Sequence, residues 1–434
     1  MIDMSEYNAG AIDLEEMPSR ASGHRAVARC DLIGRAPFSD EPDLLFRPYL
    51  GPAYRATFDI LGIWMRDAGM TVRMDAAGNL IGRYDGSEPG ARTLLIGSHI
   101  DSVRDAGRYD GPLGIMLGIE CIAALDADGR RFPFAIEVIA FGDEEGSRFA
   151  SPMLCSRAVA GTLEHDLNLI DRDGTSLPAA LAAFGLEAAC FTDAARPKGD
   201  ILAYLEAHIE QGPVLEAEQL AIGVVTGIAA QVRLRIVING CAGHAGTTTM
   251  TLRRDALTAA AQCISAIEHV AQSGSPDLVA TVGQLTVSPG AVNVIPGHAD
   301  FSVDIRAATA ATRDIARQQI EQELIAIADR RDVTIMIDEV QSLDASPCNA
   351  ALTDIMADAV ASLGYPVRRL MSGAGHDAMV MAAVTRTAML FIRCAGGISH
   401  NPAENVDAAD VDIALRAMLS FIEKLASHEA EPTT

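Results

Sequence analysis

Residues 97–114 read GSHIDSVRDAGRYDGPLG, and they place an imidazole and a carboxylate around the turn that ends an apolar strand. The preceding residues 93–96 are typical of a buried parallel strand. His99 and Asp101 therefore lie where a sheet meets a loop, a common position for ligand sites. Residues two apart on an extended segment share a face, so His99 can bind a metal ion while Asp101 orients that ligand. A buried histidine that binds no ligand is the alternative for this stretch alone.

Asp110 lies in the turn that follows this strand. Pro112 and Gly114 supply turn-forming residues, and a helix is predicted over 113–125. Asp110 therefore falls near a helix N-terminus, where it is either a ligand or a capping residue.

A second apolar run, residues 134–141, follows that helix and predicts another buried strand. The strand-helix-strand order implies a parallel sheet. This strand ends at Asp143, Glu144 and Glu145. Two adjacent carboxylates can divide the work, one binding metal and its neighbour acting as general base. A solvated acidic turn is the alternative interpretation.

Polar groups end two further predicted strands in the same way. Residues 203–213 deliver His208 and Gln211, and the strand 388–392 leads into a glycine-rich loop that contains His400. Helices are predicted over 44–68 and 151–165 earlier in the chain and over 407–426 at its end.

Between these parts of the chain, polar and apolar residues alternate, a pattern typical of half-exposed strands. It comprises strands over 233–238, 280–286, 299–306 and 333–337, with helices over 254–272 and 312–330. This β-α-β-β-α-β order indicates a ferredoxin-like module. We expect a mixed-sheet α/β catalytic domain formed by residues 1–229 and 344–434, with an inserted α+β domain at residues 230–343.

Length and composition support this organisation and exclude several partners. A chain of 434 residues exceeds what one core usually accommodates. The formal charge of −24 argues against nucleic acid and anionic membranes as partners. No apolar run approaches the roughly 20 residues of a membrane span, and the acidic start does not resemble a signal peptide. The eight cysteines form no Cys-x-x-Cys pair, so we expect reduced thiols and a cytoplasmic protein.

Five potential metal ligands lie at or just beyond predicted strand ends: His99, Asp110, Glu145, His208 and His400. Five nitrogen and oxygen ligands suit two divalent ions bridged by one carboxylate.

The chain also carries nine ordered motifs over roughly residues 45–425. They are GSHIDSV, GRYDGPLG, DEEGSRF, HIEQGP, GHAGTT, VNVIPG, DIR, SGAGHDA and ISHNPAE. Together they resemble the M20-type metal-dependent amidohydrolases, within them the branch of N-carbamoyl-amino-acid hydrolases, β-ureidopropionases and allantoate amidohydrolases.

The resemblance implies a two-metal centre in which Asp110 bridges the ions. It places His99 and His208 on one ion and Glu145 and His400 on the other, with zinc as the first expectation and manganese, cobalt or nickel as alternatives. Glu144 becomes the general base, and Asp101 joins it in the catalytic set. Family members often carry a glutamate where this chain has Asp143.

The resemblance also gives the inserted domain a role as a lid and homodimerisation module. The residues that it assigns to the substrate are Gln211, His244, Asn293, Arg306, Gly375 and His376. The planar fork of Arg306 suits a carboxylate. His244 suits a donor to the oxyanion that forms as water attacks.

The function that this resemblance implies is hydrolysis of a linear ureido group on a small carboxylate, releasing ammonia and carbon dioxide. Allantoate is the first expectation, and an N-carbamoyl-L-amino acid or N-carbamoyl-β-alanine is the alternative. An M20 peptidase or a metal-binding protein without catalysis is more remote.

Overall fold

The structure, a computed structural model, describes residues 18–163 and 167–430, and it divides into two compact units. Unit 1 consists of the chain up to Thr226, Cys348–Leu370, and the chain from His376 onward. Unit 2 consists of Gly227–Pro347 and Met371–Gly375. The acidic start considered above falls almost wholly in residues 1–17, outside the described residues.

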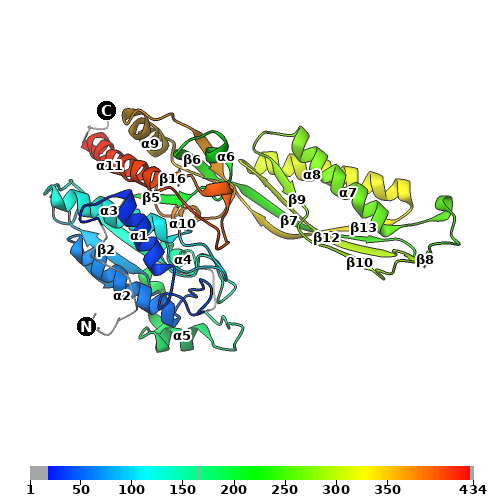
Figure 1. The fold of residues 1–434 in the computed structure, drawn as a ribbon, viewed down its shortest axis with the longest axis horizontal. Coiled ribbons are helices and arrows are strands. Elements are labelled where there is room, and N and C mark those ends of the chain that lie inside the picture. The colour runs from blue at the N-terminus through cyan, green and yellow to red at the C-terminus, as the bar shows by residue number, and fades with distance from the viewer. Residues whose placement is uncertain (1–17, 164–166, 431–434) are drawn as a thin grey trace. The chain divides into compact units, whose positions relative to one another are not determined.

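The main sheet is mixed, as expected (Figure 1). Its strands are β1 (Thr71–Met74), β2 (Leu80–Tyr84), β3 (Thr93–His99), β4 (Ala135–Phe141), β5 (Ile201–Ile209), β6 (Ile222–Ile228), β14 (Ser346–Pro347), β15 (Arg369–Ser372) and β16 (Thr387–Ile392). They run in the order β1-β2-β4-β3-β5-β16-β6-β14, and β15 also pairs with β6. The four central strands β4, β3, β5 and β16 are mutually parallel, while β2 and β6 flank them antiparallel.

Every residue of these four central strands is buried, because helices cover the sheet. The helices of unit 1 are α1 (Gly23–Ile33), α2 (Pro52–Asp67), α3 (Pro112–Ala127), α4 (Leu154–Ala160), α5 (Leu177–Ala183), η3 (Ala188–Ala194), α6 (Val214–Ala217), α9 (Ala350–Ser362), α10 (Asp377–Met381), η5 (Ala395–Gly397) and α11 (Ala408–Ala430). Helix α3 contacts β3, β4 and β5, while α9 and α11 contact β16. Helix α3 is apolar on nearly all sides, which is typical of a buried helix.

Unit 2 contains an antiparallel sheet and two long helices, and it has a hydrophobic core of its own. Its elements are β7 (Ala230–Asn239), β8 (Gly243–His244), η4 (Met250–Leu252), α7 (Ala256–Ser273), β9 (Val279–Thr281), β10 (Leu285–Ser288), β11 (Val294–Ile295), β12 (His298–Ala307), α8 (Ala310–Arg331) and β13 (Thr334–Leu343). The antiparallel sheet has the order β10-β12-β7-β13, with β9 also beside β12. Alternate residues of β12 are buried, which places one face of this sheet against α7 and α8 (Figure 1).

Three predicted elements differ from the structure. The helix expected from Leu44 begins only at Pro52, because Gly51 is its N-cap and the buried Arg47 occupies a preceding loop. The strand expected over 280–286 is two strands, β9 and β10, separated around Gly283. Helix α4 occupies only the middle of the segment 151–165, of which residues 164 and 165 lie outside the described residues.

Within the described residues, no helix alone combines the length and apolarity needed to cross a bilayer. Helices α5 and η3 pass that test only as a pair, and the chain bends by 85° between them.

Candidate metal centre and active site

Four parallel strands bring the predicted ligands to one edge of the main sheet. His99 is the last residue of β3, and His208 is the penultimate residue of β5. Glu145 follows β4, and His400 lies in the loop after β16. Because the carboxyl ends of parallel strands lie at the same edge, residues far apart in the chain meet there.

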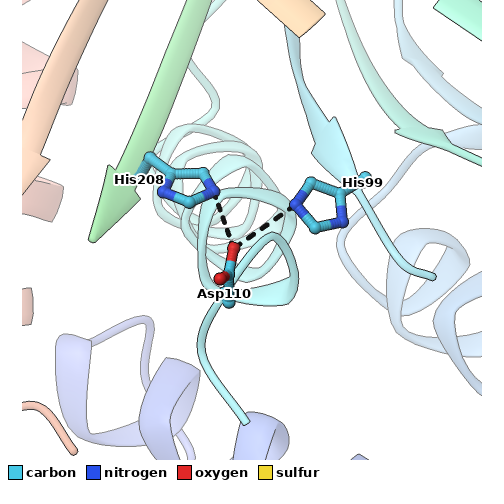
Figure 2. A group of neighbouring side chains, drawn as sticks. All are labelled: His99, Asp110 and His208. Carbon is cyan, nitrogen blue, oxygen red and sulfur yellow. Dashed lines mark ion pairs between the residues drawn. The ribbon is translucent and has the colours of Figure 1, made fainter. Parts of the chain in front are cut away.

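Asp110 lies between His99 and His208 (Figure 2) and also contacts His400. Its Oδ1 is 3.5 Å from Nε2 of His99 and 3.2 Å from Nε2 of His208. Its Oδ2 is 3.2 Å from Nε2 of His400, which is in turn 3.4 Å from Oε1 of Glu145. The five side chains thus form two groups of three that share Asp110.

The two buried histidines present their Nε2 atoms to the centre as ligand atoms. Nδ1 of His99 faces the carbonyl oxygen of Asp101 at 3.1 Å, and Nδ1 of His208 faces that of Ile209 at 3.0 Å. Because a carbonyl oxygen only accepts, each Nδ1 carries the proton. In the neutral ring Nε2 then carries a lone pair, the arrangement found in histidines that bind metals.

These residues fit a divalent cation. Nε2 of His99 and Nε2 of His208 face Oδ1 of Asp110. Burial lowers the pKa of both rings, but this carboxylate raises it above its usual value, so without a cation the centre favours protonated rings. Nε2 of His208 is buried and makes no hydrogen bond within the described part of the chain. Ligand atoms about 2.0–2.1 Å from a tetrahedral ion lie about 3.3 Å apart, which is close to the spacings around Asp110. A divalent cation between these atoms would replace the ring protons as the positive charge beside Asp110.

Glu144 and Asp101 lie beside the same group. Oε2 of Glu144 is 4.0 Å from Nε2 of His99. The carboxylate of Asp101 accepts hydrogen bonds from the backbone N–H groups of Glu144 at 3.1 Å and Glu145 at 3.2 Å. Burial raises the pKa of Glu144 well above its usual value, and the negative charge of Glu145 raises it further, against the opposing effect of His99. Bound cations favour the ionised form of such a carboxyl.

Asp143 belongs to none of the groups of potential metal ligands among the described residues. It is fully buried and adopts a left-handed backbone with φ 53°, which turns the chain between β4 and Glu144.

Two functional candidates were missed from the sequence, Ser399 and Glu404. The hydroxyl of Ser399 donates to Oδ2 of Asp110 at 2.6 Å, and Gln211 donates to the same oxygen at 2.8 Å. Glu404 accepts hydrogen bonds from the backbone N–H groups of Tyr109 at 2.8 Å and Asp110 at 3.1 Å. Burial, followed by repulsion from Asp110, raises the pKa of Glu404 to about 7. Both residues stand within the motif ISHNPAE, which was the available signal.

His376 and Glu206 form the next layer beneath the ligands. The ring of His376 lies 4.5 Å from the ring of His208 between centroids, and burial lowers the pKa of His376 well below its usual value. Glu206 on β5 accepts hydrogen bonds from Ser98, Tyr204 and the backbone of Ala378. Glu206 thus connects β3 and α10 to β5. None of the nine motifs contains Glu206, so the sequence did not indicate this role.

Four of the predicted substrate residues belong to unit 2: His244, Asn293, Arg306 and Gly375. His244 on β8 pairs with Val294 on β11, directly after Asn293, and both His244 and Asn293 are exposed. The backbone N–H of Gly246 donates to Nδ1 of His244 at 3.0 Å. The proton of a neutral His244 therefore lies on Nε2, which can act as a donor.

Arg306 on β12 is held by its own strand. Its Nε and Nη2 donate to the two oxygens of Asp304 at 2.9 and 3.0 Å, and Nη1 donates to the carbonyl of Gly373. Gly375 lies at the exposed end of the same glycine-rich segment.

Comparison with known proteins identifies the family of this chain. The model of the family described as "Peptidase family M20/M25/M40" matches residues 95–424. A "Probable allantoate deiminase" of Oryza sativa subsp. japonica is 41% identical over 94% of this chain and 89% of the relative. An "N-carbamoyl-L-amino acid amidohydrolase" of Geobacillus stearothermophilus is also 41% identical, over 86% of this chain and 92% of the relative.

Among solved structures, an amidase of the hydantoinase/carbamoylase family from Burkholderia multivorans superposes with a TM-score of 0.87. It is 33% identical and covers 96% of this chain and 100% of its own. The chain therefore belongs to the M20 peptidase family, in the branch that contains these amidohydrolases. The resemblance inferred from the nine motifs is confirmed.

Proposed function

We propose that this protein hydrolyses the linear ureido C–N bond of a small carboxylate, allantoate first, and releases ammonia and carbon dioxide. The observation that carries the proposal is the pair of ligand groups that share Asp110, with the carboxylate of Glu144 beside them. The names of the relatives support the ureido group as the target, because they are allantoate deiminases and N-carbamoyl-L-amino acid amidohydrolases.

In this proposal His99, Asp110 and His208 hold one divalent ion, and Asp110, Glu145 and His400 hold the other. Two such ions would supply Lewis acidity toward the ureido carbonyl and toward water. Zinc fits the nitrogen and oxygen ligand set, with manganese, cobalt and nickel as alternatives.

Glu144 acts as general base and accepts the proton of the attacking water. Its buried carboxylate faces the ligand group, and Asp101 fixes the turn that carries it. His244 donates to the developing oxyanion, a role supported by the acceptor state of its Nδ1. Arg306 binds the substrate carboxylate, and Asn293, Gln211, Gly375 and His376 complete the substrate set.

Unit 2 serves in this proposal as a ferredoxin-like lid and as the surface of a homodimer. Its strand and helix order supports the ferredoxin-like assignment. Most of the exposed large apolar side chains of the described residues belong to unit 2, including Met336 and Val340 on β13. β13 stands at the end of the strand order, so its outer edge is open for pairing.

A substrate panel tests the proposal. Purified protein loaded with zinc or manganese is assayed for ammonia release from allantoate, N-carbamoyl-L-methionine and N-carbamoyl-β-alanine, with a dipeptide assayed by amine release. We expect the highest kcat/KM for allantoate and negligible dipeptide cleavage. A preference for a carbamoyl amino acid would move the assignment to the alternative within the branch. Activity only on dipeptides, or none at all, would overturn the proposal.

A further inference from the structure

Glu404 joins two segments of the candidate metal centre without contributing a ligand to it. Its Oε1 accepts the backbone N–H groups of Tyr109 and Asp110, and its Oε2 lies 3.2 Å from the hydroxyl of Ser399. The residue is 4% exposed, so its carboxylate depends mainly on these partners for hydrogen bonds. One side chain therefore connects the Asp110 turn to the loop that carries His400.

Tight packing fixes this connection. A Cβ atom at Gly107 would lie 2.1 Å from Cδ of Glu404, so the carboxylate rests directly on the 107–110 turn. Ser399 lies between the two carboxylates: its hydroxyl is 2.6 Å from Oδ2 of Asp110 and 3.2 Å from Oε2 of Glu404, and its single proton is donated to one of them at a time. The turn and the loop are 289 residues apart along the chain at this contact.

The two oxygens of Asp110 are supported unequally. Oδ1 faces His99 and His208, which are placed by the fully buried strands β3 and β5. Oδ2 faces His400, which lies in a loop, has φ 54° and has a side chain that is 48% exposed. The position of His400 therefore depends on what holds its loop, and Glu404 with Ser399 supplies a direct link to Asp110.

We propose that Glu404 is a positioning residue that sets the ion site formed by Asp110, Glu145 and His400, and that the site formed by His99, Asp110 and His208 depends on it far less, because the buried strands β3 and β5 hold its two histidines. This inference rests on the proposed two-metal centre. Glu404 reaches no ligand atom of His400 itself; it acts through Ser399 and through the backbone of Asp110.

Zinc binding by the full-length, metal-stripped protein tests this assignment. Calorimetric titration with Zn²⁺ is combined with metal analysis after dialysis, for wild type and for Glu404→Ala, Glu404→Gln and Ser399→Ala. We expect wild type to bind two ions. Glu404→Ala should keep one ion at nearly wild-type affinity and lose affinity for the other by roughly 10- to 100-fold, the usual effect of removing a partner of a metal ligand.

The conservative variant and a matched control separate positioning from general stability. Glu404→Gln keeps an oxygen that can accept the two backbone N–H groups, so it should retain most of the second-site affinity. Glu120→Gln is the control, because Glu120 is a fully buried carboxylate on α3 that accepts hydrogen bonds from Ser22, Arg25 and Arg29. It should lower the thermal unfolding midpoint without selective loss of one ion.

Equal weakening of both ions in a folded Glu404→Ala protein, or wild-type binding of both, would overturn the inference. If that variant does not fold, Ser399→Ala decides, because it removes only a hydroxyl and should show the same selective loss. Wild-type protein that binds fewer than two ions would instead contradict the two-metal centre of the proposed function.

Discussion

The carboxylate of Asp101 accepts a hydrogen bond from the backbone N–H of Glu144 at 3.1 Å. The same carboxylate accepts the next N–H, that of Glu145, so one buried residue holds the backbone from which both acidic side chains project. Asp101 thereby connects the end of β3 to the turn after β4. Its position favours a role in orienting the proposed base and His99 over direct contact with substrate.

Glu144→Gln should abolish most activity while leaving metal content unchanged. The amide has the size of the carboxylate but cannot accept the proton of the attacking water, and general base catalysis contributes roughly 10²- to 10⁴-fold. Turnover and bound metal are measured on the same preparation. Retention of a tenth of wild-type kcat by a metal-loaded variant would rule out Glu144 as the base.

Chelation should abolish activity, and zinc, manganese or cobalt should restore it. In the proposed mechanism the chain's own residues hold and deprotonate water but supply no nucleophile of their own. Dialysis against a chelator, metal analysis and reconstitution provide the measurement. Full turnover by protein that is shown to be metal-free is the result that contradicts this prediction.

Arg306 should read the substrate carboxylate. Its side chain is 28% exposed and pairs with Asp304 in this structure. In the proposed function a closed lid desolvates a pair between Arg306 and the substrate carboxylate. Loss of one partner of such a pair costs about 2–5 kcal/mol, so Arg306→Ala should lower kcat/KM by roughly 30- to several-thousand-fold. Arg306→Lys should also be costly, because a point charge on a flexible stem cannot reproduce the paired contacts of the fork with the substrate carboxylate.

The control for Arg306 is Arg235→Ala on the neighbouring strand β7, where an exposed arginine pairs with Asp300 in a similar way. It should change kcat/KM little. A substrate whose carboxylate is replaced by an amide completes the test. Wild type should lose most of its efficiency on it and Arg306→Ala little more; equal losses in both would mean that Arg306 does not bind the carboxylate.

Val340→Asp should weaken a homodimer formed through unit 2. Val340 is 66% exposed at the bulge of the edge strand β13, so a charge there would lose its hydration without a partner in a dimer that covers this surface. Light scattering after size-exclusion chromatography should show a dimeric wild type and a larger monomer fraction in the variant. Ile170→Asp, at a residue of unit 1 that is 63% exposed, should leave the dimer intact. A monomeric wild type contradicts the prediction.

Stability should fall in acid partly through Glu137 on β4. Burial alone would raise the pKa of this carboxyl, but Arg196 and Arg83, at 2.7 and 3.0 Å, lower it. A lowered folded-state pKa stabilises above the unfolded pKa, roughly 4.3, and this contribution is lost as pH falls through the folded value. The difference in urea midpoint between wild type and Glu137→Gln should therefore be largest at neutral pH. It should shrink as pH falls below the unfolded pKa of roughly 4.3.

The control for this pH series is Glu423→Gln, because Glu423 pairs with Arg130 at the surface. Its effect on the urea midpoint should be small at every pH. A Glu137 difference that does not change between neutral and acid pH is the contrary result.

The pattern of apolar runs followed by polar residues was sufficient to predict the strand ends that carry the proposed ligands. Apolar runs that stop at His99, or just before Glu144, predict where a sheet delivers polar side chains, and parallel pairing brings those ends together. The prediction that α2 begins at Leu44 was wrong, because the apolar pattern does not reveal that Arg47 is buried in a loop. Arg47 donates there to the carbonyl oxygens of Ile33 and Ile100. That network is tertiary and overrides local propensity.

The network of Glu404 and Ser399 could not be derived from spacing for a similar reason. Its contacts with the 109–110 turn span 289 to 295 residues, and a glutamate in a proline-containing loop is most often solvated. Only the fold brings its carboxylate under the Asp110 turn.

The burial of β5 throughout its length gives the site an uneven resistance to local unfolding. Backbone amides around His208 and in β3 should exchange with solvent deuterium among the slowest in unit 1, because opening them disrupts the centre of the sheet. The amides near His400, in an exposed loop, should exchange far sooner. His99 and His208 thus lie in the part of unit 1 that should resist local unfolding most. His400 lies in a loop that should open far more often, so its position relative to them should depend on whether that loop is closed.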